Sequence, residues 1–251
     1  MNKINLNAIS TKGKALYLAY DQGLEHGPTD FNDKNIDPTY IIDIAKKGKF
    51  NGLIVQKGIA EQYNDEIKKA KIPLIVKLNG RTSLLKIEPY SPPLCSIKEA
   101  VDLGAKAVGH TIYVGSKHEA RMFKEFEVIQ EQAHEYGLPV IAWMYPRGKA
   151  VKNEHDKNLL AYAARIGLEL GADMLKMKYN GDVNDLKWIM KSAGKTKILI
   201  AGGQKESEQD LLKEVKELMS AGVFGFAIGR NVWQHNNPLE ITKQIKKIIF
   251  K

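Results

Sequence analysis

The chain has 251 residues, of which 43% are hydrophobic and 27% charged, and its formal net charge is +9. The composition is that of a globular protein, and the length fits one large domain or two small ones. No apolar run approaches the ~20 residues that a membrane-spanning helix needs, and the polar start is not typical of a signal peptide. The single cysteine, Cys95, excludes an intramolecular disulfide framework. We therefore expect a cytoplasmic protein without a membrane partner.

The positive charge raises the question of nucleic-acid binding. The lysines are dispersed, as in Lys46-Lys47 and Lys246-Lys247, mostly at expected helix ends or on solvated faces. The sequence contains no RNA-recognition signature, no zinc-finger spacing and no sustained basic stripe with interleaved aromatics. We therefore expect no nucleic-acid partner and interpret the charge as a lysine-rich surface, which would also attract phosphorylated metabolites.

Short apolar runs alternate with longer amphipathic stretches along the whole chain. We expect strands at 15–21, 52–56, 73–79, 106–113, 139–146, 172–179, 197–203 and 225–229. Helical patterns lie between them near 36–48, 58–70, 96–103, 116–136, 156–170, 182–193 and 206–221, with a last one at 238–250. Residues that suit helix starts, such as Asp37 and Ser116, border these patterns, and glycines such as Gly48 and Gly104 stand at the other ends, where we expect left-handed caps.

This order gives eight strand–helix units with no linker, low-complexity tract or composition shift. Eight parallel strands, each followed by a helix, within ~250 residues predict an α/β fold: one domain, 1–251, that forms a single (β/α)8 TIM barrel. The alternative, a doubly wound open sheet, would be expected to show a Gly-x-Gly-x-x-Gly turn after its first strand, and none is present. Active sites of such barrels form at the C-terminal ends of the strands, so polar residues that close a strand are the candidates.

The sixth expected strand ends in two lysines, in the run Ala172-Asp-Met-Leu-Lys-Met-Lys-Tyr179. In a strand, Lys176 and Lys178 share the inward face, which places their ammonium groups roughly 6–7 Å apart. Burial and a neighbouring cation both favour a neutral amine, the form that attacks a carbonyl to make a Schiff base. We expect Lys176 to be the deeper amine and Lys178, near the rim, to stay charged and lower the pKa of Lys176. The alternative from these residues alone is an exposed edge strand with two surface lysines.

The first and fifth expected strands each end in a group able to move a proton. Asp21 closes the first strand, where it would bond a substrate hydroxyl, pair with a lysine, shuttle a proton, or only cap the turn. Trp143 and Tyr145 share one face of the fifth strand, which gives an apolar wall followed by a phenol. Beside a protonated amine or iminium the pKa of Tyr145 would fall, which makes it a candidate general acid/base. Two core aromatics before a proline turn are the alternative.

Glycine turns close the seventh and eighth expected strands, in Ala201-Gly202-Gly203-Gln204-Lys205 and Ile228-Gly229-Arg230. Loops at these places often hold a phosphate, because glycine lets backbone N–H groups approach the oxygens and an arginine adds a bidentate donor. We therefore predict phosphate binding there. Two further residues keep open roles: Lys77 would contact ligand or pair with Asp21, and His26 would touch ligand or orient its loop.

The expected strand ends carry five motifs: Asp21-Gln-Gly-Leu-Glu-His-Gly-Pro28, Gly109-His-Thr-Ile-Tyr-Val-Gly-Ser116, Trp143-Met-Tyr-Pro-Arg-Gly148, Lys176-Met-Lys-Tyr-Asn-Gly-Asp182 and Gly229-Arg-Asn-Val-Trp-Gln234. With these motifs the chain resembles the archaeal-type class I fructose-1,6-bisphosphate aldolases of the DhnA family, from roughly residue 12 to residue 235. The resemblance implies a lyase of glycolysis and gluconeogenesis. Such an enzyme reversibly cleaves fructose 1,6-bisphosphate, a phosphorylated sugar, into dihydroxyacetone phosphate and glyceraldehyde 3-phosphate, without a metal or other cofactor.

By motif position, the resemblance implies that Lys176 forms the Schiff base, that Tyr145 donates and accepts the proton, and that Asp21 holds the substrate hydroxyls. Substrate contacts would come from Trp143, Lys178, Gly202, Gly203, Lys205, Gly229 and Arg230. Relatives form closed oligomers, so we expect a homo-oligomer. Whether Tyr145 or Asp21 removes the proton of the C4 hydroxyl does not follow from the sequence.

Two alternatives to this function stay open. A related Schiff-base branch performs transaldol chemistry in aromatic amino-acid precursor synthesis, as 2-amino-3,7-dideoxy-D-threo-hept-6-ulosonate synthase. It tends to show Lys-Thr-Asn-Tyr where this chain has Lys176-Met-Lys-Tyr179, and to lack a tryptophan at the position of Trp143, so both differences favour the aldolase. The other alternative is a non-catalytic sugar-phosphate binding barrel, which needs the phosphate loops but not the lysine.

Overall fold

Eight parallel strands form a closed barrel in a computed structural model that describes residues 4–251. The three residues 1–3 of the predicted domain lie outside the described residues. The strands are β1 (Ala15–Ala19), β2 (Gly52–Gln56), β3 (Leu74–Lys77), β4 (Ala107–Val114), β5 (Val140–Pro146), β6 (Met174–Met177), β7 (Lys197–Ala201) and β8 (Gly225–Ile228). They pair in chain order and β8 pairs with β1, so the predicted (β/α)8 barrel is confirmed and the open sheet is excluded.

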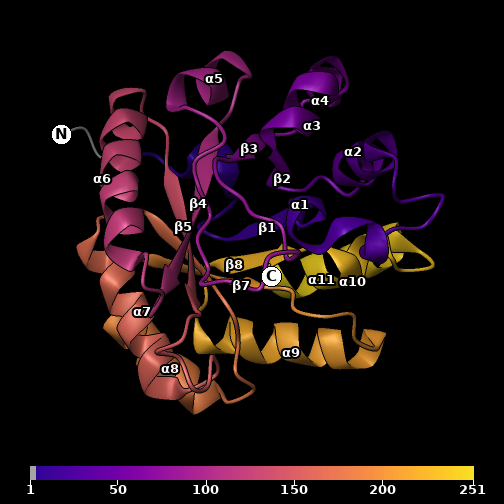
Figure 1. Cartoon of the computed structure of the whole chain (residues 1–251). Helices are drawn as coiled ribbons and strands as arrows, with labels where there is room; N and C mark the ends of the chain where they lie inside the picture. The colour runs from indigo at the N-terminus through magenta and orange to yellow at the C-terminus, as the bar shows by residue number, and fades with distance from the viewer. Residues whose placement is uncertain (1–3) are drawn as a thin grey trace.

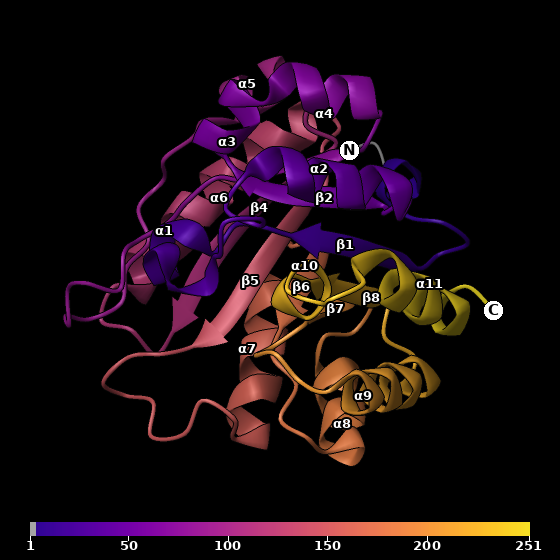
Figure 2. The same cartoon turned by 90° about the vertical axis from the view of Figure 1, so that its right-hand side faces the viewer.

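Helices surround the strands on the outside of the barrel (Figures 1 and 2). The longer ones are α2 (Pro38–Lys47), α3 (Lys57–Gln62), α4 (Asn64–Ala70), α5 (Ile97–Asp102), α6 (Glu119–Glu135), α7 (Lys157–Glu169), α8 (Val183–Ser192), α9 (Glu208–Ala221) and α11 (Pro238–Ile249). Four short helical turns were not predicted: Asn7–Ile9, α1 (Gly23–His26), Gly27–Asp30 and α10 (Arg230–Trp233). Within residues 4–251 no helix combines the length and apolarity that crossing a bilayer requires.

Three local predictions about helices were wrong. The pattern 58–70 forms two helices, because Tyr63 leaves the helical conformation (φ −114°, ψ 24°) between α3 and α4. Ser116 does not begin α6, which starts three residues later; its hydroxyl instead donates to the carbonyl of Pro89, 2.6 Å away. Gly48 ends α2 in a right-handed conformation (φ −73°), so that position does not need a left-handed glycine.

Side chains that alternate along each strand separate two layers of the core. In β6, Leu175 and Met177 pack between the barrel and its helices, whereas Met174 packs inside the barrel. In β5, Met144 faces the helices and Trp143 the interior. Both assignments follow from the two-residue period of a strand and were predicted. Lys176 therefore belongs to the inward face and lies at the C-terminal end of the barrel.

The closure of the barrel between β8 and β1 depends on Gly225. A Cβ at this position would lie 1.9 Å from the carbonyl oxygen of Ala15, which is part of the paired β1 backbone. We expect Gly225→Ala to lower the free energy of unfolding by about 1–3 kcal/mol or more, as overpacked cores do, in urea denaturation. Gly58→Ala is the matched control, because a Cβ there meets nothing within 4 Å and helix α3 favours alanine. Equal losses in the two variants would contradict this account.

Candidate active site

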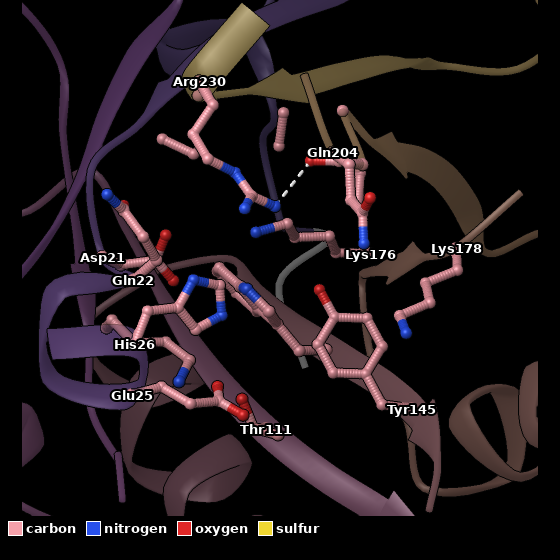
Figure 3. A pocket seen from close by; sticks show the side chains of 18 of the residues that line it. Asp21, Gln22, Glu25, His26, Thr111, Tyr145, Lys176, Lys178, Gln204 and Arg230 are labelled. Carbon is pink, nitrogen blue, oxygen red and sulfur yellow. Dashed lines mark hydrogen bonds between the residues drawn. The ribbon is translucent and has the colours of Figure 1, made fainter. Parts of the chain in front are cut away.

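A cavity of about 560 Å³ opens at the C-terminal end of the barrel. Its lining contains nine of the predicted site residues: Asp21, Trp143, Tyr145, Lys176, Lys178, Gly202, Gly203, Gly229 and Arg230. Figure 3 shows Asp21, Tyr145, Lys176 and Arg230 converging on this space from different strand ends. Lys205 does not line the cavity: its side chain is exposed and its ammonium donates to the carbonyl of Gln234, 3.3 Å away. The predicted substrate contact of Lys205 is not supported by this placement.

Lys176 lies on β6 in register with Trp143 of β5 and is only 7% exposed. Its Nζ is 4.7 Å from the centroid of the Trp143 ring, and no hydrogen-bond partner for it occurs among residues 4–251. Burial lowers the pKa of Lys176, while the carboxylates of Asp21 and Glu25 oppose the change. The site therefore favours an uncharged amine that points into the cavity.

Lys178 lies just beyond the end of β6 and is not the isolated cation that the sequence suggested. Its Nζ is 2.9 Å from Oε1 of Glu154, on the loop after β5. Arg147 approaches the same carboxylate at 3.8 Å and pairs with Glu25 at 2.9 Å. The positive charge of Lys178 is therefore compensated before it can act on Lys176. This pairing could not be predicted from local patterns, because Glu154 lies 24 residues away in the chain.

Tyr145 and Asp21 both line the cavity, but the phenol does not behave as the sequence suggested. Burial raises the pKa of Tyr145 well above its ordinary value, and the nearby carboxylates of Asp21 and Glu25 raise it further. The expected decrease requires a positive charge beside the ring, which an iminium on Lys176 would supply. Tyr145 is therefore a protonated phenol in the free protein.

The glycine turns after β7 and β8 are fixed against each other by two side chains. Asn231 donates to the carbonyls of Gly202 (2.7 Å) and Gln204 (2.9 Å), and Arg230 donates to the carbonyl of Gly203 at 2.9 Å, the dashed bond in Figure 3. Gly229 must lack a side chain, since a Cβ would lie 2.7 Å from the carbonyl oxygen of Ala19. The turns thus hold the guanidinium of Arg230 at one side of the cavity mouth, as predicted. The sequence analysis did not predict that Asn231 would connect the two turns.

Arg147 is a second cationic group of the mouth that the sequence analysis missed. It follows β5, whereas Arg230 follows β8, so the two guanidinium groups lie on different sides of the ring of strands. A basic residue directly after a strand end was the available signal, since the same signal identified Arg230. His26 also lines the cavity, and its ring is 2.8 Å from Asp30.

Lys77 is a second buried amine, 5% exposed, at the end of β3. Its Nζ donates to the carbonyl of Asn79 at 2.9 Å and lies 5.5 Å from the centroid of the Trp143 ring. It forms no hydrogen bond with Asp21 within residues 4–251, although the Asp21 charge acts on it through space. The sequence left two roles open for Lys77. Its place in the cavity lining fits contact with a ligand, whereas a direct pair with Asp21 is not formed.

The family follows from comparison with known proteins. The model of the DeoC/LacD family aldolases matches residues 15–235. This chain belongs to the DeoC/LacD family aldolases. It is 46% identical to the class 1 fructose-bisphosphate aldolase of Thermoproteus tenax, over 98% of this chain and 93% of the relative. The corresponding enzyme of Halobacterium salinarum is 42% identical, over 97% and 93%.

A solved structure gives the same result in three dimensions. It is an archaeal fructose-1,6-bisphosphate aldolase whose catalytic Lys is covalently bound to the carbinolamine intermediate of the substrate. It is 45% identical, covers 98% of both chains and has a TM-score of 0.93. Within residues 4–251 of this aldolase, no group of three or more His, Cys, Asp or Glu is placed to hold a metal ion.

Stability of this aldolase should depend on pH through Lys77. Burial lowers the folded-state pKa of Lys77 to about 8 from 10.5. Between these values the unfolded chain binds more protons than the folded one, so the free energy of unfolding rises with pH. We expect the free energy of unfolding of the wild type minus that of Lys77→Met to rise by about 2 kcal/mol between about pH 7.5 and about pH 9.5. Urea denaturation at several pH values measures this difference; a constant value would contradict the buried, lowered pKa.

Proposed function

We propose that this chain is a class I fructose-bisphosphate aldolase that acts through a Schiff base on Lys176. The observation that carries the proposal is the Lys176 amine, buried, without a hydrogen-bond partner among the described residues and directed into the cavity. The relatives from Thermoproteus tenax and Halobacterium salinarum bear the same activity in their names. A non-catalytic sugar-phosphate binding barrel would not need such an amine.

The cavity suits a sugar that carries a phosphate at each end. Its volume, about 560 Å³, lies within the range of small-molecule sites. Arg230 and the glycine turns lie at one side of the mouth, and Arg147 and Lys178 at another. Each of these cations contacts a carbonyl or carboxylate of the protein. A phosphate dianion would replace the Gly203 carbonyl on Arg230, because a charge-assisted bond to a cation is stronger than a neutral one. It would compete with the carboxylates on Arg147 and Lys178, because partly exposed ion pairs contribute little to stability.

The proposed reaction begins when the neutral amine of Lys176 attacks the C2 ketone. Loss of water gives a protonated iminium, which draws electrons from the C3–C4 bond. Removal of the C4-hydroxyl proton, by Tyr145 or Asp21, breaks that bond and releases glyceraldehyde 3-phosphate. Protonation of the remaining enamine and addition of water then release dihydroxyacetone phosphate and the free lysine.

The state of Tyr145 orders these proton transfers. Its raised pKa leaves the phenol protonated before substrate binds, which suits donation to the departing hydroxyl of the first adduct. The iminium charge then lowers the pKa of the same phenol, so that it can accept a proton only after the electron sink has formed.

The remaining predictions from the sequence stay proposals: a single domain 1–251, a homo-oligomer, a cytoplasmic location and no nucleic-acid partner.

Reductive trapping tests the proposed nucleophile. Borohydride added with dihydroxyacetone phosphate should leave a stable adduct on Lys176, found by peptide mapping, because reduction fixes the carbon–nitrogen bond of the iminium. The adduct should persist with a chelator and be absent in Lys176→Ala. Lys178→Ala is the control and should still be labelled. An adduct confined to Lys178 would refute the role of Lys176, and turnover in the transaldol reaction without cleavage of fructose 1,6-bisphosphate would refute the proposed substrate.

Tyr145→Phe separates imine formation from bond cleavage. The variant keeps the ring but loses the phenolic proton, so we expect trapping on Lys176 to persist while kcat for cleavage falls about 10²–10⁴-fold, the usual contribution of general acid–base catalysis. Single-turnover assays with fructose 1,6-bisphosphate measure the second step. Unchanged kcat would remove Tyr145 from the mechanism.

A further inference from the structure

Lys77 and Lys176 are two buried amines packed against one aromatic ring. Their Nζ atoms lie 5.5 Å and 4.7 Å from the centroid of the Trp143 ring. The ring reaches across β4 toward β3 because Gly109 has no side chain; a Cβ there would lie 2.1 Å from the ring carbons Cζ3 and Cη2. In this poorly solvated space the two amines influence each other's protonation.

The carboxylates near the two amines can balance only one ammonium group. The charges of Asp21 and Glu25 act on both lysines, but Glu25 pairs with Arg147 at 2.9 Å. Among the residues that the structure describes, Asp21 is therefore the one nearby carboxylate not engaged by another cation. A second buried ammonium would lack compensation, which is costly. One proton is thus shared between Lys77 and Lys176.

The other titratable groups around the cavity do not change this balance. Burial raises the pKa of Tyr17, Tyr113 and Tyr145, so these three phenols are neutral near pH 7. Burial also lowers the pKa of His110 to about 3, so this imidazole, which packs against Phe126 of α6 and does not line the cavity, is neutral as well. Among the other ionisable groups of the lining, Arg230 pairs with Asp30 and Lys178 with Glu154. The ring of His26 lies beside Asp30 and that of His155 beside Glu154. Arg81 donates to the carbonyls of Thr82 and Leu85, and Glu206 acts on Glu214 of α9.

Hydrogen bonding decides which amine holds the shared proton. Lys77 donates to the carbonyl of Asn79 at 2.9 Å. The Asn79 side chain is itself fixed, since it donates to the carbonyl of Thr111 and accepts from the Thr111 N–H. Lys176 has no such acceptor within residues 4–251. An ammonium loses less by burial where an acceptor is in place, so the proton belongs on Lys77.

We propose that Lys77 is a positioning residue for the aldolase reaction, whose ammonium group keeps Lys176 unprotonated until the substrate arrives. The proposal rests on the proposed function of Lys176. Lys77 thus has the role that the sequence analysis expected of Lys178, whose charge is compensated by Glu154. Coulomb repulsion acts in either direction, so a proton on one amine lowers the pKa of the other, as a charge on Lys176 does for Lys77. When the iminium forms, the phosphates of the substrate bring the negative charge that offsets two neighbouring cations.

Pentane-2,4-dione tests the proposal without phosphate binding. A neutral lysine amine attacks one carbonyl of the dione, one water leaves, and the enaminone that results absorbs in the near ultraviolet. In the wild type we expect the adduct on Lys176, with a rate that rises with pH through a midpoint. In Lys77→Met and Lys77→Gln the midpoint should move up by about one pH unit, so that the rate at neutral pH falls about tenfold. Lys77→Arg keeps the charge and should keep the wild-type midpoint.

The controls separate the possible failures. Lys178→Met should keep the wild-type midpoint; a shift there, with none in the Lys77 variants, overturns the proposal. A merely structural role for Lys77 predicts reduced stability with an unchanged midpoint, which also overturns it. Lys77→Gln retains a donor for Asn79, so it supplies the test if Lys77→Met does not fold. Absence of any adduct on Lys176 in the wild type refutes the proposed function instead.

Discussion

The structure depends on the placement of basic side chains inside a closed barrel. Closure of eight strands turns every second residue inward, away from water, and there an amine must be neutral or compensated. Lys176 and Lys77 both occupy that interior, with a single free carboxylate, Asp21, among their described neighbours. The chemistry of the site follows from this shortage of negative charge, because it makes one of the two amines a nucleophile.

The shape of the cavity depends on two glycines that let neighbouring groups pack closely against the backbone. Gly109 admits the Trp143 ring across β4, and Gly229 admits the β8 turn against the carbonyl of Ala19. Neither glycine has a left-handed backbone. Each is required because a neighbouring strand or ring occupies the place of a side chain. The width of the cavity and the separation of the amines therefore depend on two positions that carry no side chain.

Local periodicity was enough to predict which residues face the cavity. The inward faces of Lys176, Trp143 and Tyr145 follow from the two-residue repeat of a strand, and the position of Arg230 follows from a strand end. The failures have a different origin. Lys205 turns outward to Gln234, and Lys178 meets Glu154, through contacts between segments 24 to 29 residues apart. No repeat in the sequence reports such contacts, because they depend on how loops fold over the barrel.

Depth separates the two ways in which this chain uses cations. At the mouth, Arg147 and Lys178 are partly exposed, and pairs of that kind contribute little to stability, so a phosphate can displace their carboxylate partners at small cost. Below them, Lys176 has no partner among the described residues to give up, and its charged form is penalised by burial itself. The same residue type therefore binds anions where water screens it and attacks carbonyls where water is excluded. A change that let water reach Lys176 would convert a nucleophile into one more anion-binding cation.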